Sequence, residues 1–328
     1  MLPLKRQRRY HSTSRKQDLS KTLPTETHKN SVPSSEADTP TKAVEAGFKE
    51  RWLDLGGGRM RYLTTGSGRA LILVHGLMGY SFSWRFAMPA LASHATVYAI
   101  DNLGAGLSRA PEAMDCSVRA TAARVLQFAD EVGISDFDLL GTSHGGGVAI
   151  MAAALSEERS DTRLKRLILV APVNPWSPHG RRIAPFLATP LGTLVYRNTI
   201  ERWRILDYLW LRRLFSHGSK IPPDSLAGYR VPVYENQVFR HAAHILANWT
   251  ADLKEIEAAL PKIRDYPTLL MWGTRDRAVH FASGEPLRRN FRNARLVVFE
   301  DVGHLPYEEV PAEFNAALIE FLTSGAEL

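Results

Sequence analysis

The chain has 328 residues, of which 45% are hydrophobic, and it carries a formal net charge of +7 at pH 7. This is enough apolar material for a large core, and the length fits one domain with an insertion or a tail. Seven basic residues and one acidic residue fall within residues 1–21, so nearly all of the excess charge lies there. The remainder is close to neutral, which argues against a nucleic-acid-binding protein. No apolar run reaches the roughly 18 residues of a membrane span, and the single cysteine, Cys116, excludes a disulfide within the chain.

Residues 1–46 are rich in Ser, Thr, Lys, Arg and Pro and poor in residues that could form a core. We expect a disordered, basic N-terminal extension. Its Arg- and Ser-rich start is similar to a mitochondrial presequence, whereas an extension without a targeting role is the preferred interpretation. The expected location is therefore the cytoplasm, with the mitochondrial matrix as the alternative.

Folded sequence begins near Phe48. Residues 51–55 and 60–64, separated by three glycines, predict an antiparallel hairpin. Continuous apolar runs predict buried strands at residues 70–74, 95–100, 164–171, 268–272 and 294–299, and from Phe137 onward. Helical periodicity lies between them, at residues 84–91, 117–132 and after Ser143. Strands that alternate with helices predict an α/β fold with a doubly wound, mostly parallel sheet.

Residues 173–261 break this alternation. The interval is rich in Trp, Tyr, Phe, Arg and Pro, and it has helical stretches at residues 199–215 and 238–260. An insertion of this length between two core strands favours a helical cap over the strand ends. We therefore predict a core at residues 47–172 and 262–328, with a cap at residues 173–261.

The sequence Gly141-Thr142-Ser143-His144-Gly145 joins a predicted strand to a predicted helix. In this context Ser143 would lie at the apex of a sharp turn, and glycines at 141 and 145 would let the strand and helix approach. The turn would lift the Ser143 hydroxyl clear of the sheet, and the helix would direct its positive N-terminal end at the same place. The pattern indicates a nucleophilic serine.

Taken together, several motifs resemble those of the α/β-hydrolase fold family, over the chain from about Arg51 onward. They are His75-Gly76 after one strand, Asp101 with Gly104, Gly106 and Ser108 after the next, the turn at Ser143, Gly273-Thr274-Arg275-Asp276, and Gly303-His304. The chain looks like the single-cap serine hydrolases, which include small esterases, carbon-carbon bond hydrolases and cofactor-free perhydrolases. Epoxide hydrolases and haloalkane dehalogenases of this fold carry aspartate where this chain has Ser143.

The resemblance implies a catalytic triad of Ser143, Asp276 and His304. His304 would be the general base, and Asp276 would orient and stabilise it. Glu300 and Asp301 are alternative candidates for the acid of the triad, because they are close to His304 in sequence.

The backbone amides of Leu77 and His144 are the implied oxyanion hole. Met78, Phe82 and Trp84 are candidate substrate contacts. His75, Asp101 and Ser108 are expected to fix loops.

We therefore expect a serine hydrolase that cleaves a small or medium carboxylic ester through an acyl-enzyme, with a small-molecule partner and no metal or organic cofactor. One alternative is hydrolysis of a carbon-carbon bond in a vinylogous diketone, which would need cations in the cap. The cap region holds several arginines: Arg181, Arg182, Arg197, Arg202, Arg204, Arg212 and Arg213. Another alternative is a receptor-like member with little turnover.

Overall fold

The computed structural model describes residues 47–177, 184–187, 189–192, 194–195, 198, 204–233 and 236–324, with backbone alone at 187, 204–207, 233 and 236. The predicted N-terminal extension, residues 1–46, lies outside this description, as do parts of the predicted cap.

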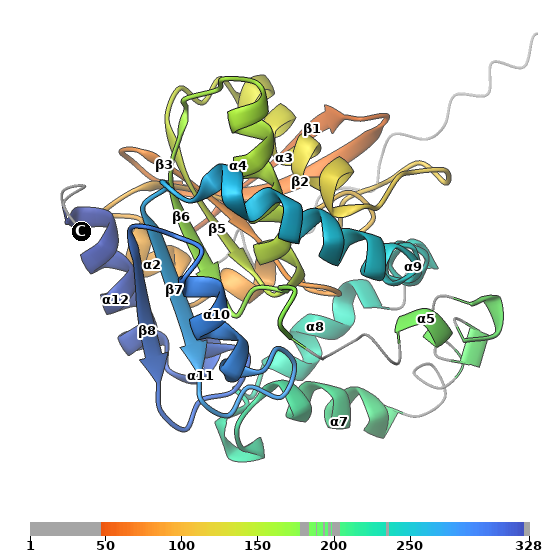
Figure 1. Ribbon diagram of the computed structural model, residues 1–328. Helices are drawn as coiled ribbons and strands as arrows, with labels where there is room; N and C mark the ends of the chain where they lie inside the picture. Colours follow the sequence, from red (N-terminus) through yellow and green to blue (C-terminus); the bar gives the residue numbers. More distant parts are fainter. Residues whose placement is uncertain are drawn as a thin grey trace, which may run out of the picture. The chain divides into compact units, whose positions relative to one another are not determined.

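The core of the described chain is an eight-stranded sheet with the order β1-β2-β4-β3-β5-β6-β7-β8 (Figure 1). The strands are β1 Lys49–Leu55, β2 Gly58–Gly66, β3 Ala70–Val74, β4 Thr96–Ile100, β5 Phe137–Thr142, β6 Leu164–Val170, β7 Thr268–Gly273 and β8 Ala294–Phe299. β2 runs antiparallel to both β1 and β4, and the remaining pairs are parallel. The predicted α/β fold with a mostly parallel sheet is confirmed.

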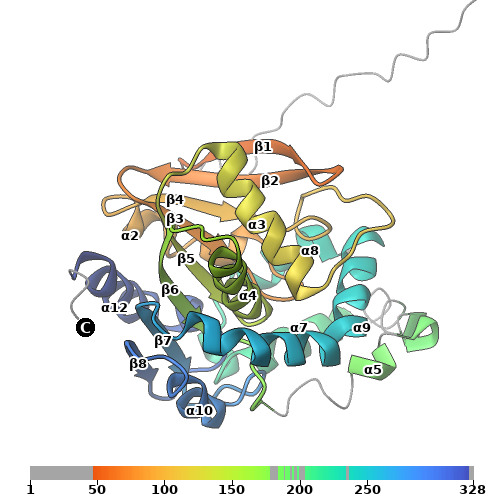
Figure 2. The same ribbon diagram turned by 45° about the horizontal axis from the view of Figure 1, so that its top comes forward.

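Helices cover both faces of this sheet (Figure 2). In the described residues they are α2 Met88–Leu91, α3 Val118–Val132, α4 His144–Glu158, α5 Ala184–Leu187, α7 Arg204–Leu214, α8 Ser225–Val233, α9 Asn236–Ala259, α10 Gly284–Arg288, α11 Pro306–Glu309 and α12 Pro311–Thr323. Short 3-10 helices span η1 Ser81–Trp84, η2 Gly218–Lys220, η3 Leu260–Ile263 and η4 Phe281–Ser283.

Successive residues of each central strand enter different apolar clusters, because side chains alternate across a strand. In β3, Ile72 and Val74 pack with α3, α4 and α10, whereas Leu71 and Leu73 pack with α2 and α12. All five side chains of β3 are buried. This explains why the strand is a continuous apolar run.

Local sequence sets the ends of α3. The Ser117 side chain accepts a hydrogen bond from the amide of Ala120, 3.2 Å away, and thereby caps the first turn. Gly133 ends the helix with φ of 74°, a left-handed conformation that glycine adopts without strain. The observed bounds agree with the expectation for residues 117–132.

The helix expected over residues 84–91 is wrong. The structure has η1, then two short-range turns in which Arg85 and Ala87 donate to carbonyls three residues back, and then α2. Pro89, in the first turn of α2, carries no N–H and favours a helix start at this point.

The segment between β6 and β7 contains α5, α7, α8 and α9. α7 falls within the predicted helix at 199–215, and α9 coincides with the predicted helix at 238–260 to within about two residues, the usual uncertainty of helix ends. Near its C-terminal end α9 joins the core, because Ile256 and Ala259 pack in the same cluster as α3 and α4. The exact limits of a separate cap therefore remain a prediction. In the described part of the chain, no helix has the length and apolar character to cross a membrane.

Candidate active site

The turn between β5 and α4 holds Ser143 in a strained backbone conformation, with φ of 53° and ψ of −120°. Its flanking glycines are required by close approach of the backbone. A Cβ added to Gly141 would lie 2.2 Å from the Gly145 carbonyl oxygen, and one added to Gly145 would lie 2.4 Å from the carbonyl oxygens of Val74 and His75. The Ser143 amide donates to Val170 O, and its carbonyl accepts from Gly146 N and Val173 N. The surrounding backbone thus fixes the strained residue.

His304 and Asp276 lie at the carboxyl ends of the adjacent strands β8 and β7. His304 Nδ1 is 2.7 Å from Asp276 Oδ2, and both side chains are buried. The other carboxylate oxygen accepts from the amides of Ala278 and Val279, at 2.7 and 2.9 Å. Asp276 is therefore held in place and can keep a proton on Nδ1 of His304, which leaves Nε2 free to act as a base.

Asp301, the alternative partner for His304 in the sequence analysis, does not pair with His304 in the described part of the chain. Its carboxylate lies at the surface near Arg275, Lys220 and His217. No ion pair or hydrogen bond links it to His304 among the interactions of the described residues. The geometry thus favours Asp276 as the partner of His304.

The loop after β3 passes directly beside Ser143. A Cβ added to Gly76 would lie 3.1 Å from Ser143 Cβ and 3.7 Å from its Oγ. Leu77, the next residue, lines the same cavity as Ser143, and the His144 amide begins α4. The first amides of a helix have no partner within that helix, so these positions suit the oxyanion role that we predicted for them.

His75 fixes this loop rather than acting on a ligand. Its Nδ1 is 2.8 Å from the Gly76 carbonyl, and its Nε2 accepts from the Asn102 amide at 3.0 Å. Complete burial lowers the pKa of His75, so the ring stays neutral with its proton on Nδ1.

Asp101 and Ser108 fix the neighbouring loop after β4. One Asp101 oxygen accepts from the Ser81 amide at 2.7 Å, and the other accepts from Arg61 Nη1 and the Leu107 amide, both at 3.1 Å. The Ser108 hydroxyl donates to the Asp101 carbonyl at 2.6 Å and accepts from the Arg61 amide at 2.7 Å. These buried contacts agree with the loop-fixing role expected from the sequence.

Ser143 and His304 open onto a cavity of about 730 Å³. Its wall is mainly apolar and comes from both the core and the segment between β6 and β7. The residues with apolar side chains are Leu77, Met78, Val173, Trp210, Leu211, Leu214, Ala242, Leu246, Trp249, Leu253, Ala278, Val279 and Leu305. Four of these, from Ala242 to Leu253, repeat at helical spacing and form one stripe of α9. A cavity of this size and character suits a medium-sized, largely apolar ligand.

Of the three side chains predicted to contact substrate, only Met78 lines this cavity. Trp84 was wrongly placed there: it is 0% exposed and packs on Tyr307, with ring centroids 4.8 Å apart. Phe82 is also absent from the cavity wall, because its ring stacks on Tyr80 and meets Tyr229 edge-on. Both side chains turn away on η1, so they support the loop rather than the ligand.

The sequence did not reveal two residues that hold the His304 loop. Glu309 Oε1 accepts from the amides of Gly303 and Ser216, at 2.7 and 2.9 Å, and Oε2 accepts from the Ser216 hydroxyl at 2.6 Å. The His304 amide itself donates to the carbonyl of Leu214, the last residue of α7, at 2.7 Å. No motif marks Glu309 or Ser216, because their role depends on a contact between distant parts of the chain.

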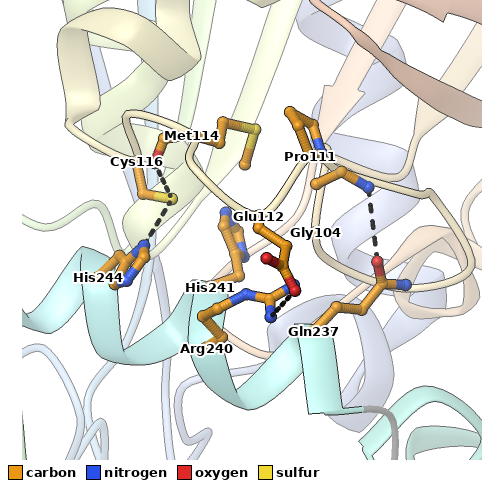
Figure 3. A pocket seen from close by; sticks show the side chains of 10 residues that line it. Gly104, Pro111, Glu112, Met114, Cys116, Gln237, Arg240, His241 and His244 are labelled. Carbon is orange, nitrogen blue, oxygen red and sulfur yellow. Dashed lines mark hydrogen bonds and ion pairs between the residues drawn. The ribbon is translucent and has the colours of Figure 1, made fainter.

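A second hollow lies between α9 and the loop that leads to α3 (Figure 3). It has about 10 Å³ of space, no more than one water would need. Cys116 Sγ lies 3.9 Å from His244 Nδ1 and donates to the Met114 carbonyl at 3.4 Å. Burial raises the pKa of the Cys116 thiol to about 11, so the sulfur is not a thiolate nucleophile at neutral pH. Across the described residues, no group of three or more His, Cys, Asp or Glu side chains is placed to hold a metal ion.

Comparison with known proteins identifies the family. The family model for the alpha/beta hydrolase fold matches residues 69–311. Haloalkane dehalogenase 2 of Mycobacterium tuberculosis is 28% identical over 282 residues, which cover 83% of this chain and 94% of that protein. N-formylmaleamate deformylase of Pseudomonas putida is 38% identical over 130 residues, 39% of this chain and 46% of that protein.

Solved structures also match. A membrane phospholipase A described as a bacterial virulence factor superposes with a TM-score of 0.64 at 27% identity, over 86% of this chain and 87% of that one. The chain therefore belongs to the α/β hydrolase fold family and is one of its hydrolases.

Proposed function

We propose that this hydrolase cleaves a small or medium carboxylic ester through an acyl-enzyme intermediate. Ser143 attacks the ester carbonyl, His304 takes the Ser143 proton and then returns it to the departing alcohol, and Asp276 stabilises the imidazolium that forms. Water, activated by the same His304, releases the acid. The amides of Leu77 and His144 stabilise the oxyanion of each tetrahedral intermediate.

One observation carries this proposal: a serine held at φ of 53° shares one cavity with a histidine that is hydrogen-bonded to a buried aspartate. Strain at a non-glycine residue costs about 1–3 kcal/mol and persists where function requires it. With ψ of −120° Ser143 also lies outside the left-handed region that turn residues ordinarily adopt, and such a conformation favours a functional role.

The nucleophile argues against the dehalogenase activity for which one relative is named. Attack of a serine hydroxyl on a haloalkane would form an ether, which has no carbonyl carbon for water to attack. The enzyme would be consumed in a single turnover. With Ser143 as the nucleophile, the covalent intermediate that water can hydrolyse is an acyl-enzyme, which releases a carboxylic acid.

The test compares wild type with Ser143→Ala. The proteins would be treated with a fluorophosphonate probe and assayed on p-nitrophenyl esters of increasing chain length. Ser156→Ala is the control, since Ser156 is a buried serine near the C-terminal end of α4, the helix that begins directly after Ser143. We expect labelling and turnover in wild type and in the control, and loss of both in Ser143→Ala. Hydrolysis that persists in Ser143→Ala would refute the proposed nucleophile.

Carbon-carbon bond hydrolysis is the second candidate, because Arg213 lines the cavity and could hold a second substrate carboxylate. A vinylogous diketone acid would distinguish the two. Turnover of that substrate with none of any ester, and its loss in Arg213→Met, would replace the ester proposal. A burst of one product equivalent without further turnover would instead favour a receptor-like protein.

A further inference from the structure

Large apolar side chains are unevenly exposed in this protein. Ten are exposed among the described residues, and seven of these fall between Trp176 and Leu209, a small part of the chain. The most exposed are Leu191 at 63%, Phe186 at 49% and Leu209 at 48%. Single exposed apolar residues are ordinary, whereas a concentration of them marks a surface that binds something. We call these seven residues the cap surface: Trp176, Phe186, Leu191, Leu194, Val195, Tyr208 and Leu209.

The same stretch is strongly basic. Residues 173–215 contain seven arginines but only two acidic residues, Glu201 and Asp207. The chain after residue 21 is close to neutral, so this stretch departs from the rest of the folded sequence. Aromatic and leucine side chains among arginines are typical of helices that lie in the interface of an anionic membrane.

The cap surface is joined to the cavity at two points. In α7, Tyr208, Leu209 and Arg212 are exposed, while Trp210, Leu211 and Leu214 line the cavity that holds Ser143. Trp176, 40% exposed, stands between Asn174 and Ser177, which both line that cavity. Exposed and cavity-lining side chains therefore alternate along these two segments.

α5, which carries Phe186, packs beside the N-terminal part of α9 in both views (Figures 1 and 2). α9 provides the apolar stripe of the cavity wall. The helix that carries Phe186 thus packs against the helix that lines the cavity.

We propose that the cap surface docks on a bilayer that contains anionic phospholipid, and that the substrate is an acyl ester held in that bilayer. The apolar side chains enter the interface, and Arg212, which is exposed on α7, lies at the level of the lipid phosphates. This inference rests on the proposed ester hydrolysis for its substrate but not for the docking itself.

Docking is tested by co-sedimentation of the full chain with vesicles made of phosphatidylcholine and phosphatidylglycerol in equal parts, and with vesicles of phosphatidylcholine alone. The cap variant is Phe186→Ser/Leu191→Ser/Leu209→Ser. The matched control is Trp52→Ser/Val298→Ser, which removes two side chains that are each 37% exposed outside the cap. None of these five residues lines the cavity.

We expect wild type and the control to bind the anionic vesicles, and the cap variant to bind about 30-fold more weakly, because three partly exposed apolar side chains no longer enter the interface. Binding should also weaken at high salt, which screens the arginines. Equal binding by wild type and the cap variant would assign the attraction to the basic residues 1–21 and overturn the proposal. If wild type does not bind vesicles but forms a dimer, and the cap variant is a monomer, the proposal is overturned. The cap surface would then contact a second copy of the chain.

Activity separates the two proposals. A medium-chain monoacylglycerol in the anionic vesicles and a soluble p-nitrophenyl ester would be supplied to both variants. The cap variant should lose at least about 10-fold in rate on the vesicle ester and keep its rate on the soluble ester. If wild type hydrolyses the soluble ester but does not bind vesicles, the docking proposal is rejected and the proposed ester hydrolysis stands. Vesicle binding without any Ser143-dependent hydrolysis would reject the ester proposal and the proposed substrate, but not the docking surface.

Discussion

Two buried histidines should make this protein sensitive to acid. His144 and His241 are 5% and 7% exposed, and neither Nε2 has a hydrogen-bond partner among the residues that the structure describes. Burial, with a smaller contribution from His75, lowers the pKa of His144 to about 4. Burial, followed by the charges of His144 and His75, lowers the pKa of His241 to about 3. Both rings are therefore neutral in the folded chain at pH 5.

The unfolded chain behaves differently, because an exposed imidazole has its ordinary pKa of about 6.5. Below that pH the unfolded state binds protons that the folded state does not bind, so the free energy of unfolding falls as the pH is lowered. From pH 6.5 to pH 5 the fall is about 2 kcal/mol for each histidine, at about 1.36 kcal/mol per pH unit. Together the two histidines should lower the free energy of unfolding by about 4 kcal/mol.

The variant His241→Phe isolates one of these contributions. The ring of His241 packs against Gly104, where an added Cβ would lie 3.0 Å from its Cγ, and phenylalanine keeps a flat ring in that place. Urea unfolding, followed by tryptophan fluorescence at pH 7 and pH 5, gives the two free energies. Relative to wild type, His241→Phe should gain about 2 kcal/mol on going from pH 7 to pH 5.

His94→Gln is the control, since His94 is an exposed histidine. Its pH dependence should match that of wild type. If His241→Phe loses as much stability between the two pH values as wild type does, the buried ring is not the source of acid sensitivity and this reasoning is wrong.

Three further predictions concern single residues. Asp276→Asn should lower kcat on a soluble ester by about 10⁴-fold, because His304 would no longer be held in the required tautomer; the circular dichroism spectrum should be unchanged. Gly145→Ala should destabilise the fold by about 3 kcal/mol in urea unfolding, since its Cβ would lie 2.4 Å from two carbonyl oxygens, and wild-type stability would contradict the required close approach. Burial raises the pKa of Asp252 to about 7, so wild type loses stability as the pH rises from about 4 to 7. Asp252→Asn should therefore raise the melting temperature more at pH 8 than at pH 5, and an equal effect at both would refute the buried, protonated carboxyl.

The sequence was sufficient to predict the sheet because its buried strands are short, continuous apolar runs between turn signals. The conformation around Ser143 was also predictable, since Gly141 and Gly145 can be explained only by close approach of the backbone. Both inferences depend on neighbours in sequence. The pairing of Asp276 with His304 required more, namely the family's order of motifs, and the structure brings these two side chains together.

Side-chain direction was less predictable. Met78, Phe82 and Trp84 all follow the same strand closely, yet only Met78 lines the cavity. Met78 has φ of 59°, and Phe82 and Trp84 lie on a short 3-10 helix whose orientation depends on the packing of Tyr229 and Tyr307. Neither feature has a signal in the local sequence, because both arise from contacts between distant segments.

The same distant contacts join the segment between β6 and β7 to the loop that carries His304. The last carbonyl of α7 holds the His304 amide, and Glu309 joins Ser216, just after α7, to Gly303. The Tyr229 hydroxyl of α8 donates to Glu308, which also pairs with Arg85 at 3.0 Å.

Two helices, α7 and α8, and Ser216 therefore meet the loop that carries His304 or the helix that follows it. A rigid displacement of α7 from the core would break the hydrogen bond that positions His304, so we expect the C-terminal end of α7 to contact the core while Ser143 reacts.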